Sequence, residues 1–225
     1  MQPTPRRTTQ VGLLCWAIQP LSLIIEVVVA ATVRAPYSWL DNTISDLGAR
    51  TCTTVAYPGV DVPVCSPLHG LMNASFMIGG ITTALGAWLL LRRQDGRFAT
   101  LPIALWTIYG LSGVLTGFVP LDVGPVLHYV VSTPAVLLGG VAVAATARLL
   151  TRRGWGGAKV WVVIGIISTL ASVFLTIRLD PAWGGLLERI GIWPSAVALA
   201  VFAWAIRYRL PRWTFGAYSS ARLDP

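Results

Sequence analysis

Both histidines of the chain stand at the start of an apolar stretch, shortly after an acidic residue. His69 follows Asp61 by eight residues and His128 follows Asp122 by six. The last apolar stretch opens on Glu188. Two imidazoles and one carboxylate form a ligand set used by catalytic zinc and non-haem iron, with positions left open for water or substrate. The pattern predicts a metal site, with zinc as the candidate ion, held by His69, His128 and Glu188.

A metal at such a site would turn a bound water into a nucleophile at neutral pH. On the outer face of a membrane that water could hydrolyse a lipid or a lipid-linked substrate. The candidate catalytic residues are Asp46, Asp122 and His128. The other interpretation is structural: acids and histidines at the start of a helix can cap its free N–H groups and meet the positive end of its dipole. The sequence leaves both open.

The elements that position these residues are membrane spans. The sequence is 55% hydrophobic and only 12% charged, and its mean hydropathy is +0.67, whereas soluble domains carry about 25% charged residues. Six apolar stretches cover 11–33, 67–91, 100–119, 126–150, 159–178 and 186–206. Each is long enough to cross the roughly 30 Å hydrocarbon layer as a helix. We therefore expect an all-α membrane protein, a bundle of six transmembrane helices in one domain (11–206) with short tails (1–10 and 207–225).

The basic residues predict the orientation. Thirteen of the 17 Lys and Arg residues precede the odd-numbered spans or follow the even-numbered ones, and such an excess marks the cytoplasmic side. The prediction is a plasma-membrane protein with both termini cytoplasmic and three in-out-in hairpins. The net charge of +8 does not indicate nucleic-acid binding, because the Arg residues sit between apolar runs. No Walker or Rossmann glycine signature occurs, so no nucleotide is expected.

The second and fourth spans resemble each other. In each, the histidine is followed by Gly-Gly after 10 or 11 residues and by Arg-Arg after 23 or 24. A matched period of this kind predicts an internal repeat. Chance similarity between two apolar sequences is the alternative.

The outer loop 34–66 carries two further predictions. Cys52 and Cys65 both lie in it and would face an oxidising compartment, which predicts a disulfide between them. Between Pro36 and Gly48 the apolar residues recur at helical spacing, with Gly48 suited to a left-handed C-terminal position, so a short interfacial helix is expected. Its polar side would turn Asn42, Ser45 and Asp46 toward the mouth of the bundle.

Glu26 lies within the first span, about 10 Å below its outer end at 1.5 Å per residue. An ionisable group at this depth is costly and must face the interior of the bundle. One interpretation is a hydrogen bond to a Ser or Thr of a neighbouring span. The other is a small proton-coupled transporter that uses Glu26, and Pro20 is the best place for the helix break that such proteins contain.

Three segments carry a family resemblance: the run Asn-Thr-Ile-Ser-Asp-Leu-Gly at 42–48, the run Val-Pro-Leu-Asp at 119–122 followed by His128, and the run Leu-Glu-Arg at 187–189. Together they resemble the uncharacterised bacterial and archaeal membrane family known as domain of unknown function 998. The resemblance covers about residues 11–206 and implies six spans, no established activity and no catalytic residues to carry over. The cysteine pair is not part of the family's pattern.

Three functions are compatible with these observations. The first is binding of membrane lipids or of a partner through an outward-facing polar pocket. The second is the metal-dependent hydrolase, and the third is the transporter.

Overall fold

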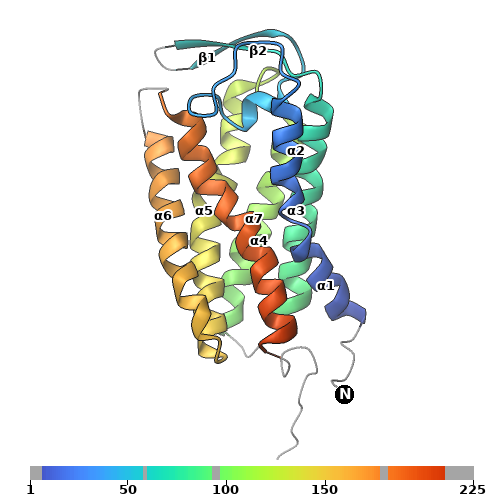
Figure 1. Cartoon of the computed structure of the whole chain (residues 1–225), viewed down its shortest axis with the longest axis vertical. Coiled ribbons are helices and arrows are strands. Elements are labelled where there is room, and N and C mark those ends of the chain that lie inside the picture. Colours follow the sequence, from blue (N-terminus) through green and yellow to red (C-terminus); the bar gives the residue numbers. More distant parts are fainter. Residues whose placement is uncertain (1–6, 58–59, 93–96, 178–181, 211–225) are drawn as a thin grey trace, which may run out of the picture.

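The computed structural model describes residues 7–57, 60–92, 97–177 and 182–210. Within these ranges, six helices are long and apolar enough to cross a membrane: Arg7–Ala30, His69–Leu91, Phe98–Phe118, Pro125–Arg152, Gly156–Ile177 and Gly184–Tyr208. Figure 1 shows them as one upright bundle with a small sheet at one end. The predicted all-α membrane class with six spans is confirmed.

The elements in chain order are α1 (Arg7–Ala17), α2 (Leu21–Ala30), the 3-10 helix η1 (Ser45–Gly48), β1 (Thr53–Tyr57), β2 (Val60–Val64), α3 (His69–Leu91), α4 (Arg97–Phe118), α5 (Pro125–Arg152), the 3-10 helix η2 (Gly156–Ala158), α6 (Lys159–Ile177) and α7 (Gly184–Tyr208).

The outside of the bundle is apolar and small polar side chains face inward. Leu170 of α6 and Val126 of α5 are 64% and 77% exposed, whereas Ser168 and Ser172 of α6 are buried. Lipid tails are as apolar as leucine, so helix association in a membrane depends on close packing of small residues and on hydrogen bonds between helices. The distribution of side chains therefore suits a hydrocarbon surrounding.

The first span is broken where the sequence predicts. Helix α1 ends at Ala17 and α2 begins at Leu21, and Pro20 between them has no N–H to continue the helical ladder. The side chain of Gln19 bridges the break: its Nε2 donates to the carbonyl oxygen of Cys15 at 2.9 Å and to Thr82 Oγ1 of α3 at 2.8 Å. A backbone group freed by the break thus has a partner inside the bundle.

Pairs of glycines set the closest helix contacts, and the pairs match the predicted repeat. A methyl group on Gly80 of α3 would overlap the carbonyl oxygen of Gly110 of α4, and one on Gly140 of α5 would overlap that of Gly165 of α6. Gly80 and Gly140 are the second glycines of the two Gly-Gly pairs. The second and fourth spans therefore pack against the next span in the same way.

The half of the bundle away from the sheet has a closely packed core. Trp16 of α1, Trp106 of α4 and Phe202 of α7 are completely buried there. Each indole has a partner, since Trp16 Nε1 donates to the carbonyl oxygen of Thr83 at 3.2 Å and Trp106 Nε1 donates to Thr146 Oγ1 at 2.9 Å. Large buried side chains therefore fill the centre of this half of the bundle.

Residues 34–57 and 60–66 cover the other end of the bundle and are called the cap from here on (Figure 1). Strands β1 and β2 pair antiparallel, with Val55 opposite Val62, and a disulfide joins Cys52 to Cys65 at the open end of this hairpin. The predicted disulfide is confirmed. The hairpin itself is an addition to the all-helical expectation.

The interfacial helix predicted between Pro36 and Gly48 is wrong in extent. Only Ser45–Gly48 is helical, as a 3-10 turn, and Gly48 is not among the described residues with positive φ. The reason lies in α7: an α-helix here would use the carbonyls of Trp39 and Leu40, but Arg189 and the N–H of Leu186 already bind these oxygens.

Candidate functional site

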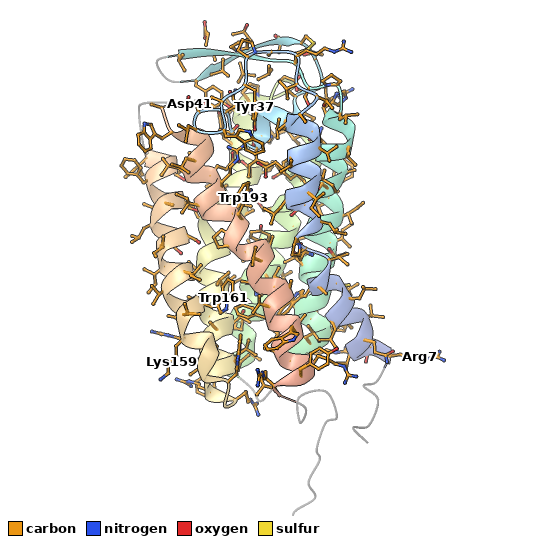
Figure 2. The ribbon with its side chains drawn as sticks, viewed as in Figure 1. Arg7, Tyr37, Asp41, Lys159, Trp161 and Trp193 are labelled. Atoms are coloured by element: carbon orange, nitrogen blue, oxygen red, sulfur yellow. A yellow bond between two sulfur atoms is a disulfide. The ribbon has the colours of Figure 1, made fainter. Side chains whose placement is uncertain are left out.

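A cluster of buried polar side chains lies directly beneath the cap. Its members are at most 8% exposed and come from the cap, α2, α5 and α7: Glu26, Asn42, Asp46, His128, Glu188 and Arg189. Figure 2 shows this end of the molecule, with Tyr37 and Asp41 in the cap and Trp193 of α7 below them, while Arg7 and Lys159 mark the opposite end. Burial of so many polar groups requires that they satisfy one another.

Glu26 of α2 forms an ion pair with Arg189 of α7. Arg189 Nε lies 2.9 Å from Glu26 Oε1, and both side chains are at most 5% exposed. The second carboxylate oxygen, Oε2, accepts a hydrogen bond from Trp193 Nε1 at 2.7 Å. The carboxylate is thus compensated by a cation and by a second donor, as a buried charge requires.

Arg189 also holds the cap. Its Nη1 donates to the carbonyl oxygens of Trp39 at 2.9 Å and Asn42 at 2.8 Å, and its Nη2 donates to the hydroxyl of Tyr37. All three guanidinium nitrogens therefore have partners. The sequence predicted that Glu26 faces the interior, which is confirmed. The structural interpretation named Ser or Thr as its partner, whereas the partners are Arg189 and Trp193. The presence of an acid inside a span was itself a signal for a cationic partner, because a cation at a similar depth on another span compensates a buried carboxylate most strongly. Arg189 could have been found in this way.

Glu188 of α7 binds the first residues of η1. Its Oε2 accepts a hydrogen bond from the backbone N–H of Ile44 at 2.6 Å, and its Oε1 lies 3.3 Å from Ser45 Oγ. The carboxyl group is 5% exposed. Two neighbouring residues of α7, Glu188 and Arg189, therefore both bind the segment 39–45 of the cap.

His128 in the first turn of α5 is fixed in one tautomer. Its Nδ1 lies 2.6 Å from the carbonyl oxygen of Val119, which can only accept, so Nδ1 carries a proton. Its Nε2 lies 3.0 Å from Ser45 Oγ. In the neutral imidazole Nε2 is then an acceptor, directed at the hydroxyl of Ser45.

Ser45 thus stands between His128 and Glu188 and has one proton to donate. If Ser45 donates its proton to His128 Nε2, a hydrogen bond between Glu188 and Ser45 requires a protonated Glu188 carboxyl group that donates to Ser45 Oγ. If Ser45 instead donates to Glu188, His128 must be an imidazolium that donates from Nε2 to Ser45 Oγ. Two consistent arrangements exist, and they differ by the shift of protons along three side chains. The sequence places Ser45 on the polar side of its segment but gives no sign of either partner.

Asp46 ties η1 to the preceding loop and to β1. It accepts hydrogen bonds from the Tyr57 hydroxyl at 2.6 Å, from the backbone N–H of Thr43 at 2.8 Å and from Asn42 Nδ2 at 3.3 Å. Burial raises the pKa of Asp46, and these hydrogen bonds offset only part of that rise. Burial, together with the carboxylate of Asp46, also raises the pKa of Tyr57 well above its usual value.

Asp122 joins the hairpin to the loop between α4 and α5. It accepts the backbone N–H groups of Arg50 and Thr51, both at 2.9 Å, and the Thr51 hydroxyl at 2.8 Å. Burial acts to raise the pKa of Asp122, but these hydrogen bonds outweigh it and leave the pKa below its usual value. Asp46 and Asp122 hold loop and strand groups, and neither carboxylate caps η1 or α5. The helix-capping interpretation is therefore wrong for these two residues.

The structure brings only part of the predicted metal set together. His128 and Glu188 flank Ser45, whereas His69 lies half-buried at the start of α3 with its Nδ1 3.0 Å from the carbonyl oxygen of Ser66. Across the described ranges, no three His, Cys, Asp or Glu side chains form a group that could hold a metal ion. The zinc site stays a prediction.

A cavity of about 100 Å³ lies inside the bundle below this cluster. Its wall is mainly apolar, with Met72, Phe76 and Ile192 among its residues, and its polar groups include Ser45, Glu26 and Glu188. Gln19 and Ser22, on either side of the break in the first span, also line it. Mainly apolar pockets with a few converging polar groups are typical ligand sites.

A family model described as protein of unknown function (DUF998) matches residues 17–205. The chain belongs to the DUF998 family. The match begins at the end of α1 and ends within α7, so the DUF998 region contains the cap, the buried polar cluster and the cavity. No curated protein and no solved structure is significantly similar to the chain. The predicted family is confirmed.

Proposed function

We propose that this DUF998 protein binds a small amphipathic molecule, lipid-like in character, in the cavity beneath the cap. The observation that carries the proposal is the composition of the cavity wall: most of it is apolar, and Glu26, Glu188 and Ser45 are among its polar residues. An apolar tail would replace empty space against Met72 and Phe76, at about 25 cal/mol for each Å² of apolar surface removed from water.

The polar groups favour a ligand whose head group donates hydrogen bonds. Arg189, the cation of the cluster, already uses every nitrogen on Glu26, on the cap backbone or on Tyr37. Glu188 and Ser45 supply oxygen atoms at the cavity. A hydroxyl or amine head group therefore fits this lining better than a carboxylate does.

The cap is proposed to lie on the outer side of the plasma membrane, with both termini in the cytoplasm. The support is the excess of Lys and Arg at the opposite end of the spans and the Cys52–Cys65 disulfide, which persists in oxidising compartments. Membrane-impermeant labelling of a cysteine introduced at Trp39 on intact cells tests this. Labelling of that cysteine supports the orientation, and its protection until the membrane is opened contradicts it.

Binding is measured as thermal stabilisation of the full chain in phosphatidylcholine nanodiscs by octanol, octylamine or octanoate. A ligand at 100 times its Kd stabilises by about 2.7 kcal/mol, so octanol and octylamine should raise Tm and octanoate should not. Ala135→Phe, which fills the cavity from α5, should abolish the effect. Val130→Phe, a control on the same helix at a position 64% exposed, should retain it. Equal stabilisation of both variants would contradict the proposal.

The break in the first span favours proton-coupled transport as a second candidate function. Transporters commonly place broken helices at the substrate site near the middle of the membrane, and Gln19 beside the break lines the cavity. Proteoliposomes containing a pH-sensitive dye test this with octanol as the probe. Octanol-dependent proton entry that disappears in Glu26→Gln and persists in Arg50→Met supports transport; entry equal to that of empty liposomes excludes it.

A further inference from the structure

Ser45 and His128 have the relative geometry of a nucleophile and its general base. Their Oγ and Nε2 atoms are 3.0 Å apart, within the 2.6–3.2 Å range in which a side chain can take a proton from a nucleophile. The imidazole is oriented by a third group, the carbonyl oxygen of Val119, at 2.6 Å from Nδ1. In serine hydrolases a carboxylate holds the histidine in this same tautomer.

The contact between His128 Nδ1 and the carbonyl oxygen of Val119 determines which ring nitrogen carries the proton. A carbonyl oxygen has no proton to give, so Nδ1 must donate to Val119 and Nε2 keeps its lone pair in the neutral ring. That lone pair faces Ser45 and no other described hydrogen-bond partner of Nε2 competes for it. His128 is 2% exposed, so bulk water has little access to the base.

Ser45 is also at a place where a substrate can reach it. Ser45 lines the cavity, whereas His128 is not among the lining residues. Ser45 therefore lies between the ligand space and the base. Glu188 also lines the cavity. Its Oε1 lies 3.3 Å from the Ser45 hydroxyl and is a second group that can exchange a proton close to the reacting atoms.

We propose that Ser45 is the nucleophile of an acyl-transfer site, with His128 as its general base, acting on carboxylic esters of amphipathic molecules. The proposal rests on the proposed ligand cavity and names the chemistry performed on its occupant. It differs from the metal-dependent hydrolase in needing no metal: the nucleophile is a protein hydroxyl.

The steps balance with an ester and water as the only reactants. Ser45 Oγ bonds to the carbonyl carbon while its proton passes to His128 Nε2. The bond from that carbon to the alcohol oxygen then breaks, and His128 returns the proton to the leaving oxygen. Water attacks the acyl-Ser45 ester, loses a proton to His128, and releases the carboxylic acid as Ser45 regains its proton.

The direct test is covalent labelling of the full chain in nanodiscs with an alkyl fluorophosphonate, followed by mass spectrometry of the peptide that contains Ser45. We expect a phosphonyl adduct on Ser45, its loss in Ser45→Ala, and a labelling rate about 100-fold lower in His128→Gln, since general bases contribute 10²–10⁴-fold. Thr54→Ala is the control, because Thr54 is an exposed hydroxyl residue of β1 outside the cavity lining and its loss should not affect the adduct. No adduct on Ser45, or an unchanged rate in His128→Gln, would overturn the proposal.

A second variant keeps the test valid if Ser45→Ala unfolds. Ser45→Cys in a Cys15→Ala background places a thiol beside His128, and the native disulfide leaves no other free cysteine. We expect this thiol to react with a small maleimide at least 10-fold faster than the same thiol in a His128→Gln chain. Equal rates would contradict a base at this position, and a merely structural hydrogen bond predicts them.

Ester turnover separates this proposal from the binding proposal. The wild type should hydrolyse 4-nitrophenyl octanoate, and both Ser45→Ala and Ala135→Phe should lose this activity. Stabilisation by octanol without any adduct on Ser45 would refute the nucleophile and leave the cavity standing. An adduct on Ser45 without stabilisation by octanol would support the nucleophile and contradict the proposed ligand.

Discussion

Arg189→Met should strongly destabilise the protein, because it removes the cation from a buried ion pair and leaves Glu26 without its charge partner. The two side chains are 5% and 2% exposed, so water cannot replace the lost cation. Loss of one partner of a buried pair costs about 3–5 kcal/mol. At about 2–4 °C per kcal/mol for a chain of this size, Tm should fall by roughly 6–20 °C.

The double variant Glu26→Gln/Arg189→Met isolates the charge interaction. It removes both charges, so its loss of stability should be smaller than the sum of the two single losses by about 2–3 kcal/mol. Arg50→Met is the control, because the Arg50 side chain is exposed and only its backbone N–H contacts Asp122. The assay is thermal unfolding in detergent, followed by near-ultraviolet circular dichroism.

Two results would refute the reasoning. A Tm of Arg189→Met within about 2 °C of the wild type would mean that the pair is hydrated or absent. Additive losses in the double variant would mean that Arg189 acts through the cap carbonyls of Trp39 and Asn42 and not through Glu26.

Three further predictions concern packing, pH and the cap. Gly80→Ala should lower the free energy of unfolding by about 1–3 kcal/mol, because the added methyl group overpacks against the Gly110 carbonyl. Gly70→Ala is the control, since a methyl group there meets nothing within 4 Å and should leave thermal unfolding unchanged. Equal effects of the two substitutions would contradict the close helix contact. The pKa of Asp122 is lowered in the folded chain, so this residue stabilises the fold at pH values above its ordinary pKa of 3.8, and the stabilisation is lost as the pH falls through the folded-state pKa. The Tm difference between wild type and Asp122→Asn should therefore shrink on acidification. A Tm difference that does not change with pH would contradict this prediction. Replacing Cys52 and Cys65 by Ser should cost about 3 kcal/mol, the chain-entropy value for a loop of about 15 residues, and should abolish the effect of reductant on Tm.

The buried cluster also accounts for the irregular conformation of the cap. Four apolar residues at helical spacing predict a helix between Pro36 and Gly48, but Glu188 binds the N–H of Ile44 and Arg189 binds the carbonyls of Trp39 and Asn42. Each of these bonds replaces one that an α-helix would form. The local helical pattern is therefore overridden by hydrogen bonds from Glu188 and Arg189 of α7, which lie more than 140 residues away in the chain.

The sequence by itself determined the features that depend on composition and local order. Six apolar runs must cross a hydrocarbon layer, a proline within the first run interrupts its helix, and two cysteines in one loop are near enough to pair. Glu26 had to face inward because its charge cannot face lipid. None of these inferences requires knowing which helix lies next to which.

Only the tertiary structure decided the partners. Glu26 and Arg189 are 163 residues apart in the chain, and Ser45 and His128 are 83 apart. Their contacts depend on the order of the helices in the bundle, on the rotation of each helix about its axis and on the path of the cap, and helical periodicity specifies none of these. The sequence therefore located the polar residues at one end of the bundle, and the packing of α2, α5 and α7 beneath the cap made them an ion pair and a serine–histidine pair.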